Sequence, residues 1–362
     1  MKMPEFVRAA VALLVLVAAG ASFAGPVGEM HRVTADPTAS LRDEQHGSEL
    51  RITVWYPAAA DAVERDIAIG PPGEPLRKVG SVAPGAAFAS DTERRPVILF
   101  SHGYGGTARL MGWFGIALAR DGYIVISVDH PGNNGMDTMT PAGAMLWWDR
   151  TEDLRLALKA VAQDPVIGPH LDVSRVGAAG FSAGGFTALV AAGARVDPTH
   201  FSRFCSANPD DGVCQPQRES NFTAQDYVEL LKRPDIQAEM AHATDDHSIK
   251  QVRAAFVMAP ALVQALQPAS LEHLHTPVEI MLGDLDTTAP PVTNGLVAVR
   301  MIQNASLIEL SGVGHLDFLS TCTELGLAKV PICKSRVPQE DTHARAIKAA
   351  EVFFNRQLGV TH

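Results

Sequence analysis

The feature that most constrains this chain is a serine flanked by glycines, set between a short apolar run and a helical pattern. Gly180-Phe181-Ser182-Ala183-Gly184 follows the run 175–179 and leads into the small-residue stretch 183–194. A serine on so tight a strand-to-helix turn has a strained backbone, and only glycines let strand and helix approach closely. The helix N-terminus would also present unpaired amides to an anion beside the serine. The pattern predicts Ser182 as a nucleophile, with a plain glycine-rich turn as the alternative.

A serine hydroxyl is a weak nucleophile at neutral pH, so it needs a histidine base and a carboxylate that orients the histidine. Where a nucleophile follows a strand in this way, the chain order is serine, acid, histidine. Ser311-Gly312-Val313-Gly314-His315 follows the apolar run 306–310 and presents a histidine on a glycine-rich loop. We therefore predict His315 as the general base, with a structural histidine as the alternative.

The acid is expected between these two residues, in the loop 283–290 that follows the apolar run 278–282. We prefer Asp286, because the usual loop places the acid a few residues after the glycine and shortly before the proline. Asp284 is the alternative acid, and its structural role would be to cap the turn. Asp317 is expected only to cap the helical turn after His315.

An acyl-transfer site also needs two backbone amides for the oxyanion. One is expected from Ala183, next to the nucleophile. The other is expected from the loop Ser101-His102-Gly103-Tyr104-Gly105-Gly106, which follows the apolar run 97–100, and there we favour the amide of Tyr104. His102 is interpreted as structural.

Short apolar runs alternate with helical patterns from residue 95 onward, which predicts a doubly wound, mostly parallel sheet with helices on both faces. Residues 31–35 and 50–56 are expected to form antiparallel strands at one edge. The segment 57–93 is rich in Pro, Gly and Ala and is interpreted as a surface loop. The predicted strands are 97–100, 123–128, 175–179, 254–258, 278–282 and 306–310, and the predicted helices are 108–120, 150–162, 183–194, 291–302 and 342–357.

The polar segment 197–248 interrupts the alternation, and we interpret it as a cap inserted over the sheet; the alternative is a peripheral excursion that does not touch substrate. The chain has four cysteines. Pairing of neighbours, Cys205 with Cys214 and Cys322 with Cys333, is the simplest of three connectivities, and free buried thiols are the alternative. The cysteine spacings disfavour zinc, and a group at 242–247 with two histidines and two aspartates is read as a solvated helix face.

The N-terminus indicates export. Lys2 and Arg8 precede the apolar run 9–19 and the small residues Ser22-Phe23-Ala24, which is typical of a signal peptide over residues 1–24. The alternative is an uncleaved membrane anchor, although the run is shorter than a typical membrane span. Residues 25–362 would then form one domain in the periplasm or outside the cell, with no stable membrane insertion after cleavage. The formal net charge of −10 makes nucleic acid an unfavourable partner.

Together with Asp129-His130-Pro131-Gly132 and Trp147-Trp148-Asp149-Arg150, these motifs resemble a known family. The chain looks like a bacterial predicted dienelactone hydrolase of the alpha/beta-hydrolase superfamily, close to the platelet-activating-factor acetylhydrolase type. The resemblance covers roughly residues 97–319 without the insertion. It departs at the nucleophile, because true dienelactone hydrolases carry a cysteine where this chain has Ser182.

The resemblance implies hydrolysis of carboxylic esters through an acyl-serine intermediate, on a small-molecule or lipid ester and without metal or organic cofactor. Tyr104, Trp147 and Trp148 are candidates to line an acyl pocket, although large aromatic residues are more often plain core. The alternatives are a serine peptidase, an acyltransferase with the same intermediate, and a non-catalytic binding protein that retains the fold.

Overall fold

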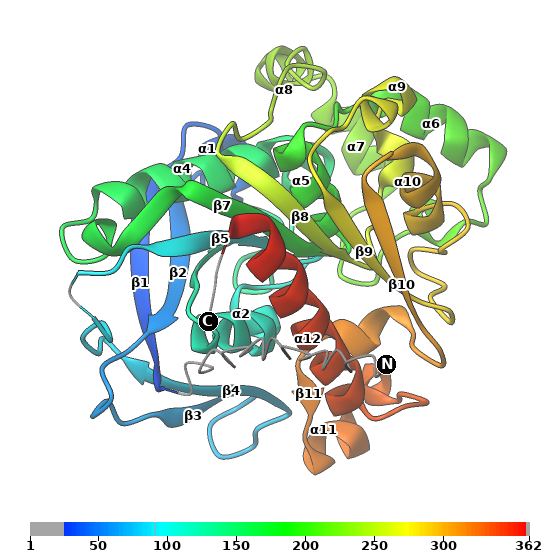
Figure 1. Ribbon diagram of the computed structural model, residues 1–362. Helices are drawn as coiled ribbons and strands as arrows, with labels where there is room; N and C mark the ends of the chain where they lie inside the picture. The colour runs from blue at the N-terminus through cyan, green and yellow to red at the C-terminus, as the bar shows by residue number, and fades with distance from the viewer. Residues whose placement is uncertain (1–24, 91, 360–362) are drawn as a thin grey trace, which may run out of the picture.

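A computed structural model describes residues 25–90 and 92–359, so the predicted signal peptide at 1–24 lies outside the described residues. These residues form an eleven-stranded sheet in the order β10-β9-β8-β7-β5-β6-β2-β1-β4-β11, with β3 paired to β4 (Figure 1). From β10 to β6 every neighbouring pair is parallel. The strands are β1 Val27–Ala35, β2 Glu49–Pro57, β3 Arg65–Ile69, β4 Arg77–Pro84, β5 Arg95–Ser101, β6 Ile124–Asp129, β7 Leu171–Phe181, β8 Val252–Met258, β9 Val278–Gly283, β10 Ala305–Leu310 and β11 Thr321–Cys322.

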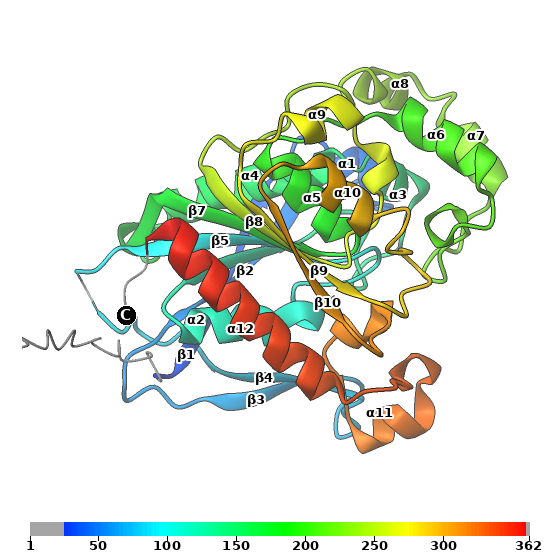
Figure 2. The ribbon, with the colours of Figure 1, turned by 45° about the vertical axis from the view of Figure 1, so that its right-hand side comes forward.

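Helices cover both faces of the sheet, so the predicted doubly wound fold and its six parallel strands are confirmed. On one face lie α4 (Asp149–Gln163), α5 (Ala183–Ala192) and α10 (Gly295–Met301); on the other lie α2 (Gly112–Arg120) and α12 (Gln339–Leu358) (Figures 1 and 2). Strands β5, β6, β8 and β9 are almost wholly buried, and their runs of Val, Ile, Leu and Ala pack against a helix layer on each side. The shorter helices are α1 Ala39–Arg42, α3 Pro141–Met145, α9 Pro268–Glu272 and α11 Glu324–Lys329.

The expectation of a surface loop over 57–93 is wrong, because this segment contains β3 and β4. Val79 and Val82 of β4 are buried, and a Cβ on Gly112 of α2 would lie 2.6 Å from Val79. Helix α2 is therefore packed between the main sheet and β4, as Figure 2 shows. The Pro and Gly content of this segment favours a loop when the sequence is considered alone, although Val79 and Val82 face inward and form a second layer over α2.

The predicted antiparallel pairing of 31–35 with 50–56 is present as β1 and β2, but the pair does not form the edge of the sheet. Strand β2 also pairs with β6, and β1 continues to β4 through Gly28 and Glu29. The expected edge position is therefore wrong, because β4, which pairs with β1, comes from the segment 57–93 that was interpreted as a loop.

The segment 197–248 contains three helices, α6 (Pro198–Ala207), α7 (Ala224–Leu230) and α8 (Pro234–Met240). A disulfide joins Cys205 of α6 to Cys214, and a second joins Cys322 of β11 to Cys333, which is the nearest-neighbour pairing. Among the described residues, none of the helices is both long and apolar enough to span a membrane.

Helix α12 and helix α2 both hold the backbone just after His315. His343 of α12 donates from Nε2 to the Leu319 carbonyl at 3.0 Å, and Trp113 of α2 donates to the Phe318 carbonyl at 3.0 Å. The two rings stack with centroids 3.7 Å apart. Burial lowers the pKa of His343 to about 4, because an imidazolium in this position would lose its hydration.

This lowered pKa predicts a loss of stability in acid. The neutral ring of His343 contributes stability that is complete above pH 6.5 and is lost as the pH falls through about 4. Over that window the contribution amounts to up to about 3 kcal/mol. Chemical denaturation at several pH values should therefore show a flatter acid limb for His343→Gln than for the parent protein. His273→Gln, at an exposed histidine, is the control; equal acid limbs for all three proteins would contradict the assignment.

Candidate active site

Ser182 lies on the turn between β7 and α5 in a strained backbone conformation, with φ 57° and ψ −121°. A Cβ on Gly180 would lie 2.0 Å from the Gly184 carbonyl oxygen, and one on Gly184 would lie 1.9 Å from the Ser101 carbonyl oxygen. Both glycines of the motif are therefore required by close backbone contacts. The turn is held on its far side by β8, because the Ser182 amide donates to the Met258 carbonyl at 3.0 Å.

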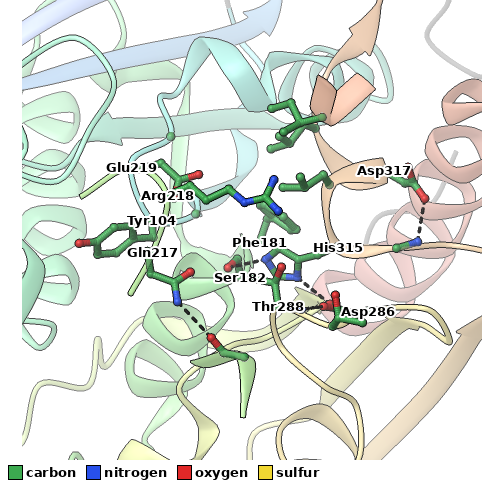
Figure 3. Close-up of a pocket in the computed structure, with 18 of the residues that line it drawn as sticks. Tyr104, Phe181, Ser182, Gln217, Arg218, Glu219, Asp286, Thr288, His315 and Asp317 are labelled. Atoms are coloured by element: carbon green, nitrogen blue, oxygen red, sulfur yellow. Dashed lines mark hydrogen bonds and ion pairs between the residues drawn. The ribbon is translucent and has the colours of Figure 1, made fainter. Parts of the chain in front are cut away.

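Ser182, His315 and Asp286 form one chain of hydrogen bonds (Figure 3). Ser182 Oγ lies 2.8 Å from His315 Nε2, and His315 Nδ1 lies 2.6 Å from Asp286 Oδ2. The second carboxylate oxygen of Asp286 accepts from the amides of Thr288 and Ala289 at 2.9 and 2.8 Å. These two donors and the position of Asp286 identify Nδ1 as the protonated nitrogen, which leaves Nε2 to accept from the serine hydroxyl.

The structure separates the two aspartates of the 283–290 loop. Asp284 accepts from the Ser311 hydroxyl at 3.1 Å and from the Gly312 amide at 2.7 Å, so it ties its own loop to the loop that carries His315. Asp317 accepts from the Gly314 amide at 2.7 Å, which is the capping role expected for it. Of the three carboxylates near the histidine, Asp286 is the one bonded to the ring.

The loop after β5 passes close to the nucleophile, since a Cβ on Gly103 would lie 3.2 Å from Ser182 Cβ. Within the described residues, neither the amide of Tyr104 nor that of Ala183 donates to a protein acceptor. The next amide in the loop, that of Gly105, is taken by Asn133 Oδ1 at 2.9 Å, and Asn133 Nδ2 donates to the Gly143 carbonyl at 3.0 Å. The two free amides are the pair that the sequence suggested.

A layer of buried polar side chains, His102, His130 and Arg150, supports this loop. His102 is fully buried, donates from Nδ1 to the Gly103 carbonyl at 2.6 Å and accepts from the His130 amide at 3.3 Å, so its role is structural. Arg150 donates to the His102 carbonyl and to Thr187 Oγ1 of α5. Burial lowers the pKa of Arg150 to about 9 and holds the pKa of both histidines well below the usual range. Sequence reasoning missed Asn133 and gave Arg150 no structural role, because both act across the fold.

Two cavities meet at Ser182. One cavity has a volume of about 1140 Å³ and extends from Ser182 past the Asp286 and His315 loops. We call it the polar lobe because charged side chains line it, namely Arg77, Asp210, Arg218, Glu219, Lys334 and Arg336. The apolar lobe has a volume of about 860 Å³ and extends under segment 197–248. Tyr104, Ser182, Gln215, Pro216, Gln217 and Thr288 line both lobes.

The apolar lobe contains two of the three predicted pocket residues, Tyr104 and Trp147. Trp148 was a wrong candidate, because its ring is fully buried in the core and its Nε1 donates to Glu239 at 3.2 Å. Segment 197–248 supplies further walls that the sequence did not identify. Its larger apolar contributions are Phe201, Val213, Phe222, Tyr227, Leu231 and Met240.

Segment 197–248 also contacts both loops of the site. Tyr104 hydroxyl and Ser220 hydroxyl lie 2.7 Å apart, and Thr293 donates to Asp211 at 2.7 Å. A Cβ on Gly212 would lie 2.1 Å from the Thr287 carbonyl oxygen, next to Asp286. In the same segment His242 and Asp245 are exposed and paired at 2.9 Å, and no group of three or more metal-binding side chains occurs within residues 25–90 and 92–359.

Comparison with known proteins identifies the family to which the chain belongs. The sequence model of one family, described as alpha/beta hydrolase fold, matches residues 96–320. A ferulic acid esterase from Streptomyces cinnamoneus is similar in structure, with a TM-score of 0.60 and 19% identity over 95% of this chain and 93% of that chain. No curated protein matches the sequence.

A second similar structure is a puromycin-hydrolyzing peptidase from Mycobacterium tuberculosis, with a TM-score of 0.51 and 14% identity. The match covers 92% of this chain and 40% of that chain, so this chain spans less than half of the peptidase. At these identities both likenesses show the fold alone.

The geometry predicts that Asn133 fixes the loop that presents the Tyr104 amide. Asn133→Ala would leave the half-buried Gly105 amide and the buried Gly143 carbonyl without partners, and we expect the free energy of unfolding to fall by about 2 kcal/mol. Denaturant unfolding measures the change. Asn304→Ala, which removes an exposed amide-to-carbonyl bond of 3.0 Å, should cost much less. Equal losses in the two variants would contradict the role of Asn133.

Proposed function

The chain belongs to the alpha/beta hydrolase fold family, and within it we propose that the protein is a serine hydrolase of carboxylic esters. The observation that carries the proposal is the hydrogen-bonded chain from Ser182 through His315 to Asp286, located where two cavities meet. A buried serine, histidine and aspartate in this order supply a nucleophile, a base and an orienting acid. The free amides of Tyr104 and Ala183 would supply the oxyanion donors.

The mechanism follows from the protonation states that the hydrogen bonds support. His315 Nε2 takes the proton from Ser182 as Oγ attacks the ester carbonyl carbon, and Asp286 stabilises the imidazolium that forms. The tetrahedral oxyanion lies against the two amides, and its collapse breaks the bond to the alcohol, which receives the proton from His315. Water then attacks the acyl carbon and gives a proton to His315. The bond to Ser182 Oγ breaks, His315 returns the proton to Oγ, and the carboxylic acid leaves.

The two lobes suggest which half of the ester goes where. The apolar lobe is lined by aromatic rings and aliphatic side chains, with Trp147 packed edge-on against Phe201 and Phe222 against Tyr227. Such a lining favours the acyl half of the substrate, because burial of carbon surface is its main source of affinity. Since segment 197–248 forms much of this lining, we propose that it is a cap that takes part in substrate binding.

The finer family placement and the location are part of the same proposal. The motifs that resemble the dienelactone hydrolase and platelet-activating-factor acetylhydrolase type favour an ester as substrate, while Ser182 in place of a cysteine disfavours lactone opening. Two disulfides are typical of an oxidising compartment. Together with the leader-like residues 1–24, they support an exported protein.

The first test is the hydrolysis of p-nitrophenyl esters from acetate to palmitate. We expect turnover by the parent protein, and a loss of about 10⁴-fold or more in kcat for Ser182→Ala and for His315→Ala, because either change removes the acylation step. The chain length with the highest kcat/KM reports how much of the apolar lobe the acyl group fills. If Ser182→Ala retains the parent rate, the proposal is wrong. Turnover of matched anilides without turnover of esters would favour the peptidase instead.

The two aspartates of the 283–290 loop provide a matched pair of variants. Asp286→Asn would leave His315 without its carboxylate partner, and we expect kcat to fall by about 10³- to 10⁴-fold. Asp284→Asn removes only a tie between loops and should leave kcat within about tenfold of the parent. Steady-state kinetics on one ester decides between them, and a larger loss for Asp284→Asn would reassign the acid.

A further inference from the structure

The polar lobe contains an arginine that is almost buried and has no acidic partner. Arg77, the first residue of β4, is 6% exposed and lines the cleft that contains Ser182. Its Nη1 donates to the Ser320 carbonyl at 2.5 Å, whereas its Nη2 has no hydrogen-bond acceptor among the described residues. The hydroxyl of Ser320 also lacks a partner there.

A guanidinium in such a position is costly for the folded protein. Burial lowers the pKa of Arg77, and no carboxylate acts to raise it again. Most other buried charges here are paired; Arg42, for example, lies 2.7 Å from both Asp36 and Asp153. An unpaired and nearly buried cation that lines a substrate cleft is the arrangement expected of a residue that receives its counterion from a ligand.

Two exposed cations lie beside Arg77. Lys334 and Arg336 line the same cleft, and neither forms an ion pair with any described residue. Lys334 is the residue after Cys333, and Arg336 follows two residues later. The disulfide from Cys333 to Cys322 places this stretch near Arg77, because Cys322 pairs with Arg77 across β11 and β4. We call Arg77, Lys334 and Arg336 the basic wall.

Among the described residues, no carboxylate of the cleft forms an ion pair with the basic wall. Asp317, the nearest along the chain, accepts from the Gly314 amide and from Ser335 Oγ. Asp284 accepts from the Gly312 amide, and Asp286 is bonded to His315. Glu219 and Asp210 come from segment 197–248, and Figure 3 shows Glu219 and Asp317 on opposite sides of Ser182. Arg218, next to Glu219, is a fourth cation of the same cleft.

We propose that the basic wall binds an anionic group, a carboxylate or a phosphate, on the alcohol half of the ester. The inference rests on the proposed function, because it follows from placing the acyl half in the apolar lobe and the leaving alcohol in the polar lobe. Arg77 is the main contact, since a guanidinium matches the planar or tetrahedral oxygens of such groups. Lys334 and Arg336 attract the group from solution and add less, because they are exposed.

The test uses butanoate esters that share the acyl group and differ in the charge of the alcohol. The alcohols are 4-hydroxybenzoate, 4-hydroxyphenyl phosphate and the neutral 4-hydroxybenzamide. At low ionic strength we expect kcat/KM for at least one anionic ester to exceed that of the amide ester by about tenfold, and added salt to reduce the ratio. The two anionic arms show whether carboxylate or phosphate is preferred. A ratio near one for both anions would overturn the proposal.

The variants separate the basic wall from the catalytic residues. Lys334→Ala/Arg336→Ala should raise KM for the preferred anionic ester by about threefold and leave the amide ester unchanged. Arg77→Gln should raise the same KM by about tenfold or more. Because Arg77→Gln removes a bond to the Ser320 carbonyl and can weaken folding, the double variant is the decisive one. Lys159→Ala, at an exposed lysine of α4 outside the cleft, is the matched control. Equal losses on charged and neutral esters would contradict the inference.

A binding measurement distinguishes failure of this inference from failure of the proposed function. Calorimetry on Ser182→Ala should show tighter binding of 4-hydroxybenzoate or 4-hydroxyphenyl phosphate than of 4-hydroxybenzamide, and this difference should shrink by about threefold when Lys334 and Arg336 are also replaced. If no ester is hydrolysed but this difference is found, the esterase proposal fails and the basic wall stands. If esters are hydrolysed and no difference is found, the reverse holds.

Discussion

The close approach of β7 and α5 is the constraint on which the rest of the site depends. Gly180 lies so near the backbone of α5, and Gly184 so near the end of β5, that neither position accepts a Cβ, and Ser182 between them takes a positive φ. That strain is held by bonds on both sides of the turn: the Ser182 amide donates to Met258, and the Ser182 carbonyl accepts from Ala261 at 3.1 Å. The position of Ser182 is therefore fixed by bonds to β8 and to the residues that follow this strand.

The same geometry explains why so many buried polar groups gather on one side of the sheet. The Tyr104 amide must remain free of protein acceptors, so the loop after β5 is held by hydrogen bonds to its other atoms. These bonds come from His102, Arg150 and Asn133. A second layer, in which Asp153 binds His130 and Arg42, connects this support to the N-terminal part of the chain. Burial raises the pKa of Asp36, a further partner of Arg42, to about 6. Burial of these polar groups costs desolvation energy, but their hydrogen bonds restrict the loop after β5 to one conformation.

The division of the cleft into two lobes depends on segment 197–248. Without its helices, Ser182 would lie on an open sheet edge; with them, an apolar cavity and a polar cleft meet at the nucleophile. Contacts of this segment with the Tyr104 loop and with Thr287 of the Asp286 loop connect substrate binding to the two loops that would carry the chemistry. The disulfide from Cys205 to Cys214 closes the segment on itself next to those contacts.

The sequence by itself determined the parallel strands of a doubly wound sheet, the turn at Ser182, and the loops that carry Asp286 and His315, and it favoured the disulfide pairing that the structure has. These depend on local patterns, such as apolar runs, glycine spacing and neighbouring cysteines, that short stretches of chain carry in full. Only the tertiary structure decided that β4 covers α2, that Trp148 belongs to the core, that Asn133 and Arg150 support the Tyr104 loop, and that Arg77 reaches the cleft. Each of these depends on contacts between residues far apart in the chain, and a side chain's neighbours across the fold leave no trace in its local sequence.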